Sequence, residues 1–265
     1  MPPFDLEQGK LSIRVSDGVY YQLLTDIEDF AFKKSNGSDN ANAFFNQLLP
    51  NLVAYRKEKR KDLRNYLTNN IIHCIKDNYQ DKLLYFMDDL FDFCYFDDYR
   101  ERYHRQTLHF RLNKANIVKL QSFFDELESQ NQNKTSYLRN LFNEYANMRK
   151  DKREELCFDK EYSLLYQAIT NKCSITCSFK DNRYTLLPYK IDLNYVDGSL
   201  YLLALDIEKT HICHTFRLCW LRDIVQKETH GYVFSSKAVE KLEYLIYKYD
   251  YTGKTSINLS RLKLD

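Results

Sequence analysis

The sequence lacks several features that mark common classes of protein. It has only 6 glycines and 4 prolines in 265 residues, which disfavours a turn-rich enzyme scaffold and suits long helices with short connections. Its 7 cysteines are an odd number without close pairs, so we expect no disulfide framework. No signal peptide and no apolar run long enough to cross a membrane is found. We therefore expect a cytoplasmic protein with no membrane partner.

A charge excess of one sign is also missing. The formal net charge is +2, so no overall field favours a polyanion, and any such partner has to be bound by local patches. Aromatic residues, in contrast, are abundant at 15%, with 22 tyrosines. Tyrosine suits both packed cores and surfaces that stack nucleic-acid bases, and the composition leaves both interpretations open.

A charged segment occurs twice in the chain. Residues 55–63 read YRKEKRKDL and residues 148–156 read MRKDKREEL, with five of the nine positions identical. The apolar pattern upstream repeats as well. Residues 11–23 and 108–120 each begin with the alternation of a half-buried strand and continue with helical spacing. Each copy therefore predicts a strand followed by two helices.

The two copies resemble the ribbon-helix-helix fold, in which paired strands lie over a core of helices. Ser16 and Asn113 are the predicted helix starts after the strands. Such a small unit cannot bury its own apolar face, so it needs a partner copy, within the chain or from a second chain. The resemblance implies that outward polar residues of the ribbon contact nucleic acid, and the alternative is that the ribbon only holds the domain together. These outward residues are Ser12, Arg14, His109 and Arg111.

The second helix of each copy is predicted to start near Ser38 or Thr135, and Pro50 is expected to kink or shorten the first of them. The first charged segment carries the larger positive charge, so we expect it to bind a polyanion. Its candidate residues are Arg56, Lys57, Arg60 and Lys61.

Between the copies, residues 67–106 are predicted to form a helical connector. Its acidic run at 87–98 lacks the register of a calcium loop, so a solvated helical face is the favoured interpretation. Residues 99–105, YRERYHR, are a further candidate for phosphate or base contacts.

After residue 173 the pattern changes to short strands with tight turns, which predicts a small Sm- or SH3-like barrel. The predicted strands cover residues 175–179, 184–189, 191–196, 200–205 and 212–218, and a helix follows at about 236–249.

Four segments in this half are similar to the WYL domain. YSLLYQAI at 162–169, PYK at 188–190, GSLYLLALD at 198–206 and TFRL at 215–218 occur in the family's order. Leu200 replaces the eponymous tryptophan, and two of the family's arginines are displaced here, so the pocket is expected to be rearranged. The resemblance implies a ligand-sensing module that binds nucleotides or single-stranded nucleic acid through basic and aromatic side chains. Its implied binding residues are Phe179, Lys180, Arg183, Tyr189, Tyr201, Arg217 and Arg222.

An alternative places Tyr201 in the core and Arg217 in an internal salt bridge. A zinc site is not expected, because Cys173 and Cys177 would lie roughly 13 Å apart on a strand. No nucleophile elbow, phosphate loop or carboxylate pair stands out, so we expect no cofactor and no enzymatic activity.

The predicted fold class is α+β: a helical region with two ribbon-helix-helix-like copies, a small Sm/SH3-like β-barrel and a C-terminal helical extension. The predicted domains are residues 1–66 (first copy), 67–106 (connector), 107–158 (second copy), 159–228 (WYL domain) and 229–265 (extension, a possible dimer contact).

This domain pairing resembles the accessory proteins of type VI-D CRISPR systems. The resemblance implies a non-catalytic protein that binds single-stranded RNA and enhances an RNA-guided RNA nuclease, its functional partner. WYL proteins commonly self-associate, so a homodimer is expected. The alternative is a ligand-responsive, DNA-binding transcriptional repressor.

Overall fold

The structure, a computed structural model, describes residues 4–5, 8–71, 75, 79, 82–84, 86, 105–227, 232–248 and 251–262. The chain divides into two compact units, Met1–Met148 and Arg149–Asp265. Helices and antiparallel sheets are combined, as the sequence predicts. Most of the predicted connector, including the acidic run and residues 99–104, lies outside the described residues.

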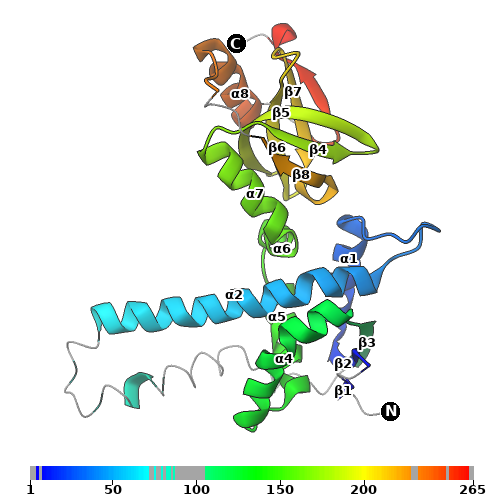
Figure 1. The fold of residues 1–265 in the computed structure, drawn as a ribbon, viewed down its shortest axis with the longest axis vertical. Helices are drawn as coiled ribbons and strands as arrows, with labels where there is room; N and C mark the ends of the chain where they lie inside the picture. Colours follow the sequence, from blue (N-terminus) through cyan, green and yellow to red (C-terminus); the bar gives the residue numbers. More distant parts are fainter. Residues whose placement is uncertain are drawn as a thin grey trace. The chain divides into compact units, whose positions relative to one another are not determined.

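The first unit consists of two strand–helix–helix copies (Figure 1). The strands are β1 (Phe4–Asp5), β2 (Lys10–Ser16) and β3 (Arg105–Arg111), in the sheet order β1-β2-β3. The helices are α1 (Asp17–Asp29) and α2 (Ala41–Asn70) in the first copy, and α4 (Lys114–Ser129) and α5 (Lys134–Ala146) in the second.

The four helices of this unit begin at or near the residues that the sequence predicts. Ser16 and Asn113 cap α1 and α4, because their side chains accept hydrogen bonds from backbone N–H groups of the first turn. Helices α2 and α5 begin near Ser38 and Thr135, as predicted, and their capping residues are Asn40 and Asn133.

Strands β2 and β3 pair antiparallel, so the two copies meet within one chain. Leu11 lies opposite Phe110, and Ile13 lies opposite Leu108, all four of them buried. The helices cover this apolar side: the ring of Phe110 stacks on that of Phe45 in α2, with 4.2 Å between centroids. The period of two in the strands thus gives the ribbon one buried face and one outward face.

Helix α2 runs through Pro50 and is not shortened, contrary to the expectation from its sequence. Proline has no N–H, so the carbonyl of Asn46, four residues earlier, has no helical donor at this point. Asn116 of the second copy donates its Nδ2 to that carbonyl at 2.6 Å. The proline therefore leaves an acceptor that the second copy uses, and the helix continues.

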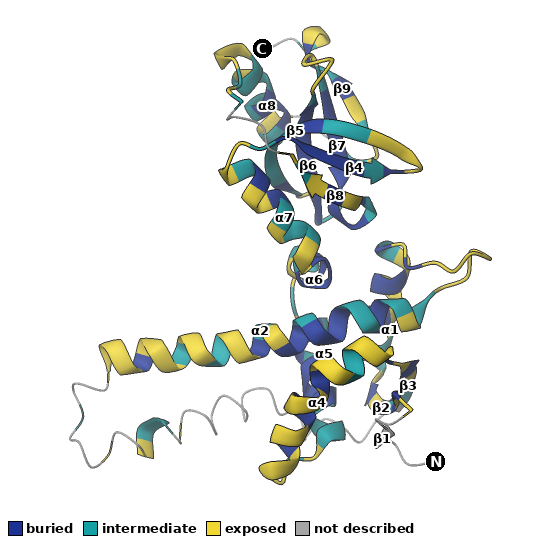
Figure 2. Cartoon of the chain, in the orientation of Figure 1, coloured by how far each residue is buried: buried dark blue, intermediate teal, exposed yellow. Residues whose placement is uncertain are grey.

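The two charged segments lie in different units. YRKEKRKDL is part of the continuous helix α2, which is buried in its first half and mostly exposed beyond it (Figure 2). In the second copy α5 ends at Ala146 and is capped by Asn147. From Arg149 on, MRKDKREEL belongs to the second unit, where residues 150–156 lie in a separate helix, α6 (Lys150–Cys157).

In the second unit α6 and α7 (Asp159–Thr170) lead into a six-stranded antiparallel sheet. The sheet order is β8-β4-β5-β6-β7-β9. Its strands are β4 (Ile175–Phe179), β5 (Asn182–Asn194), β6 (Ser199–Asp206), β7 (Ile212–Arg217), β8 (Arg222–Gln226) and β9 (Ser256–Asn258). A 3₁₀ turn, η2 (Leu218–Trp220), joins β7 to β8, and α8 (Ser236–Lys248) precedes β9.

Two expectations for this sheet are corrected. The strands predicted at 184–189 and 191–196 are one strand, β5, whose register against β6 shifts between Pro188 and Lys190. This irregularity interrupts the alternation of side chains, and so the pattern reads as two strands. The described strands also form no closed barrel, because no pairing joins the two edge strands, β8 and β9. The edge strands β8 and β9 were not predicted.

Candidate nucleic-acid interface

The outward face of the β2–β3 ribbon carries polar residues from both copies. Ser12 Oγ and His109 Nδ1 lie 2.9 Å apart in a hydrogen bond across the strands. Lys10 and Thr107 lie on the same face. The sequence did not predict them, because each strand begins before the first apolar residue of its alternating pattern. The face therefore joins these two residues to the predicted set of Ser12, Arg14, His109 and Arg111.

Backbone carbonyls near the ribbon are held by arginine side chains. Nε of Arg111 donates to the carbonyl of Gln8 at 3.1 Å, and Nε of Arg139 in α5 donates to the carbonyl of Arg14 at 2.8 Å. A guanidinium has five N–H donors, so Arg111 can contact this carbonyl and a phosphate at once.

A groove of about 400 Å³ lies along the exposed half of α2, facing α4 and the start of α5. Its α2 wall contains all four predicted basic residues and adds Arg64, which was not predicted. The opposite wall includes Phe123, Glu126 and Tyr137. Cations outnumber carboxylates around this groove, so its field favours an anionic ligand.

One predicted residue of the basic helix is not on the surface. Arg56 is 2% exposed, and its Nη1 lies 3.6 Å from a carboxylate oxygen of Glu144 in α5. Its guanidinium carbon also lies 4.8 Å from the ring centroid of Tyr137. Burial raises the pKa of Glu144, although Arg56 and Lys59 oppose that shift. Arg56 therefore holds α2 to α5. The sequence predicted it to be a surface ligand for a polyanion, and its burial contradicts that prediction.

The other predicted cations of this helix lie at the groove in exposed or half-buried positions. Nζ of Lys57 contacts Oε2 of Glu126 at 3.1 Å, and both side chains are about half exposed. Nζ of Lys61 lies 3.5 Å from Glu58 on the same helix face. Such exposed pairs are weak in water, so a phosphate can compete for these lysines.

In the second unit, the β4–β5 hairpin presents two of the predicted cations. Nζ of Lys180 lies 5.4 Å from the ring centroid of Phe179 and 5.7 Å from that of Trp220. Arg183 is exposed on β5, opposite Ser178. Phe179 itself is 4% exposed and stacks on Phe216, so its ring is mainly a packing element.

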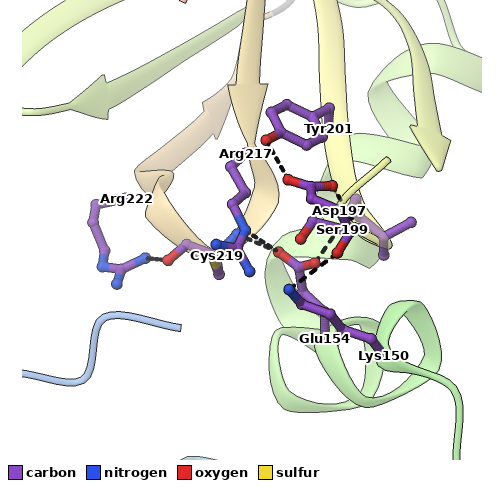
Figure 3. Close-up of polar contacts among 9 residues, drawn as sticks. Lys150, Glu154, Asp197, Ser199, Tyr201, Arg217, Cys219 and Arg222 are labelled. Atoms are coloured by element: carbon purple, nitrogen blue, oxygen red, sulfur yellow. Dashed lines mark hydrogen bonds and ion pairs between the residues drawn. The ribbon is translucent and has the colours of Figure 1, made fainter. Parts of the chain in front are cut away.

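Tyr201 and Arg217 lie in an internal polar cluster around Glu154 of α6 (Figure 3). Glu154 is fully buried and accepts hydrogen bonds from the backbone N–H groups of Leu200 and Cys219. Nε of Arg217 lies 3.7 Å from its Oε1. This is the internal salt bridge that the sequence left open as the alternative.

Tyr201 is a core residue, which is the alternative to a binding role that the sequence left open. It is 4% exposed, packs in the cluster that α8 covers, and donates its hydroxyl to Asp197 at 2.8 Å. Tyr189 packs against the same cluster and donates to Glu243. Arg222 donates to the backbone carbonyls of Cys219 in η2 and of Leu221 directly after it.

The implied WYL binding residues do not share one surface. Tyr201 lies on the face of the sheet that α8 covers, and Arg217, its cross-strand partner in the pairing of β6 with β7, points to the same face. Phe216 and Arg217 are consecutive in β7, so their side chains point to opposite faces. Phe179 stacks on Phe216 and therefore lies on the face away from Tyr201 and Arg217. Lys180 and Arg183 are therefore the exposed basic pair of this set that one hairpin holds together.

The described residues contain no group of three or more His, Cys, Asp or Glu side chains that could hold a metal ion. The cysteines of the sheet are instead buried: the pKa of Cys177 is raised to about 12 by burial, and Cys213 and Cys219 are buried in the same unit. Within the described residues, no helix has both the length and the apolar character needed to span a membrane.

Comparisons with known proteins find a likeness in structure only. No protein-family model and no curated protein matches the sequence. A solved structure described as a CRISPR Cas-related protein matches with a TM-score of 0.66 and 17% sequence identity. The match covers 96% of this chain and 74% of that chain, so the two share a fold over nearly the whole length of the present sequence.

Proposed function

We propose that the protein is a non-catalytic accessory protein of a CRISPR system, which binds single-stranded RNA and enhances an RNA-guided RNA nuclease. The observation that carries this proposal is the shared fold with a CRISPR Cas-related protein over 96% of the chain. The basic groove along α2 and the Lys180–Arg183 hairpin supply local positive charge, which a protein of net charge +2 needs for binding RNA.

Within this proposal the first unit is a ribbon-helix-helix pair and the second a WYL domain. Intramolecular pairing of β2 with β3 supports the first assignment. For the second, the four strands from β4 to β7 follow one another in the sheet, and the fifth, β8, returns to pair with β4 rather than with β7. With β9 added beside β7, that is the strand order of a small barrel that is open between β8 and β9. A homodimer remains part of the proposal, although the ribbon needs no second chain.

The test is a titration with single-stranded RNA, single-stranded DNA and a DNA duplex at two salt concentrations. We expect RNA to bind most tightly, with an affinity that falls as salt rises. A Lys180→Ala/Arg183→Ala variant should bind RNA roughly tenfold more weakly, because two phosphate-binding cations are removed. These side chains are exposed, so the variant should fold. Equal affinity for all three nucleic acids would contradict the RNA-binding role.

Nuclease enhancement is tested separately, by adding the protein to a type VI-D effector loaded with guide and target RNA. The proposal predicts faster RNA cleavage with the effector and no cleavage by the protein alone. An unchanged cleavage rate would contradict the accessory role even if RNA is bound.

The second candidate is a DNA-binding repressor, which the polar ribbon favours. Lys10 and Thr107 join the four predicted polar residues on its outward face, which is more than the sequence indicated. If this reading holds, the duplex should bind most tightly, and an Arg14→Ala/Arg111→Ala variant should lose that binding while Lys180→Ala/Arg183→Ala keeps it.

A further inference from the structure

The groove along α2 has one feature that a plain basic surface lacks. Among its lining residues a single carboxylate, Glu126 of α4, accompanies five cations of α2. Oε2 of Glu126 lies 3.1 Å from Nζ of Lys57, and the two side chains are 51% and 50% exposed. An exposed ion pair of this kind is screened by water and exchanges readily. Glu126 thus places an anion beside a groove cation before any ligand is present.

The spacing of the cations indicates what kind of anion the groove suits. Lys57, Lys61 and Arg64 recur four and three residues apart on α2, so they lie on one face, with neighbours about 5–6 Å apart. A compact anion can contact only part of such a row, whereas an extended polyanion with successive charges can follow all of it. The amides of Asn65, Gln130 and Gln132 also line the groove and can donate to and accept from base edges.

We propose that the groove follows the phosphate backbone of single-stranded RNA, and that Glu126 is an internal competitor that a phosphate displaces from Lys57. This inference rests on the proposed RNA-binding function and adds a regulatory contact to it. Nζ of Lys57 lies 5.3 Å from the ring centroid of Phe123, so the lysine stays near the groove when its anionic partner changes.

The decisive variant is Glu126→Gln, which keeps the shape of the side chain and removes its charge. Its matched control is Glu128→Gln on the same helix, since Glu128 is paired with Lys134 outside the groove lining. Removing the competitor should tighten binding of a single-stranded RNA about fivefold, whereas a general loss of negative charge would tighten both variants equally.

A second variant removes the row of cations: Lys57→Ala/Lys61→Ala/Arg64→Ala. All three residues are exposed, so the variant should fold, which circular dichroism checks. RNA affinity should fall at least tenfold, and the slope of log affinity against log salt should fall by about 2, because each lost phosphate contact removes roughly 0.7. Lys119→Ala, an exposed lysine of α4 outside the groove lining, should leave the affinity unchanged.

The outcomes separate this inference from the function on which it rests. If the wild-type chain binds no RNA, both are overturned. If it binds RNA but the groove variants match their controls, only the groove inference is overturned. The same holds if the triple variant loses binding of ATP, used as a free-nucleotide probe, while RNA affinity stays constant, because the groove would then be a nucleotide site.

Discussion

Arg56 and Arg149 occupy the same position of the repeated charged segment, yet they have different environments. Arg56 is buried between α2 and α5 against Glu144, whereas the side chain of Arg149 is 71% exposed and contacts Asp151 two residues away. Further along the segment, the first copy has the exposed residue and the second copy has the buried one. Lys61 of the first copy is 66% exposed, and Glu154, at the same position of the second, is fully buried.

These contrasts follow from what packs against each segment. The first is the middle of a long helix, one side of which faces α5 of its own unit. The second forms a short helix of the other unit, where backbone N–H groups of the sheet and Arg217 surround Glu154. Similar charged sequences can therefore stabilise a core or face water, and the partner element decides which.

The largest effect should come from Glu154→Ala. The substitution removes the acceptor of two backbone N–H groups and leaves Arg217 as a buried cation, so the second unit should lose about 3–5 kcal/mol. Trp220 is the only tryptophan and lies in this unit, so its fluorescence in a urea titration reports the loss. The neighbouring variant Glu155→Ala removes a partly exposed pair with Lys152 and should cost below about 1 kcal/mol. Equal costs would show that burial of Glu154 does not matter.

Arg56→Ala and Arg149→Ala compare the two copies directly. The first should destabilise the first unit by about 2–3 kcal/mol, because Glu144 stays buried with only Lys59 beside it, whose side chain is 41% exposed and whose Nζ also lies 3.6 Å away. The second should change stability by less than about 0.5 kcal/mol, because its ion pair is exposed. Urea unfolding followed by far-ultraviolet circular dichroism measures both. A large cost for Arg149 would contradict the assigned environments.

A smaller effect is expected where the second copy compensates for Pro50. Asn116→Ala should cost about 1–2 kcal/mol, since the carbonyl of Asn46 then has neither a helical donor nor a side-chain donor. In a Pro50→Ala background the helix supplies its own N–H, and the same substitution should cost less. A double-mutant cycle in urea gives this coupling, and additive costs would refute it.

The smallest effect concerns pH. Burial raises the pKa of Glu154 above 4.5, although Arg217 and the backbone donors oppose that shift. Between the pKa of Glu154 in the unfolded state and its higher pKa in the native state, the native state binds more protons. The free energy of unfolding should therefore fall as pH rises through that window. Urea titrations followed by Trp220 fluorescence over a pH series measure this slope. The substitution Glu154→Gln should flatten this dependence of the free energy of unfolding on pH. If the slope persists in that variant, another titrating group causes it.

The local pattern predicted the elements well where one apolar period dominates a segment. Leu11, Ile13 and Val15 identify β2, and Ser16 marks the start of α1, because alternation and capping are local properties. The pattern failed at Pro50 and in β5, where a distant asparagine or a strand irregularity decides the outcome. The ribbon residues were predicted together for the same local reason, whereas Arg56 was misplaced because only α5 reveals its burial.

By itself, the sequence determined the two-copy organisation of the first unit, the outward polar face of the ribbon and the change to strands near residue 173. These depend on periods of two and of 3.6, which neighbouring residues set. Only the tertiary structure decided which charges are buried, where the second charged segment belongs, and that Glu126 faces the basic row of α2. Those outcomes depend on contacts between residues far apart in the chain, and a charged side chain carries no local mark of the partner that will cover it.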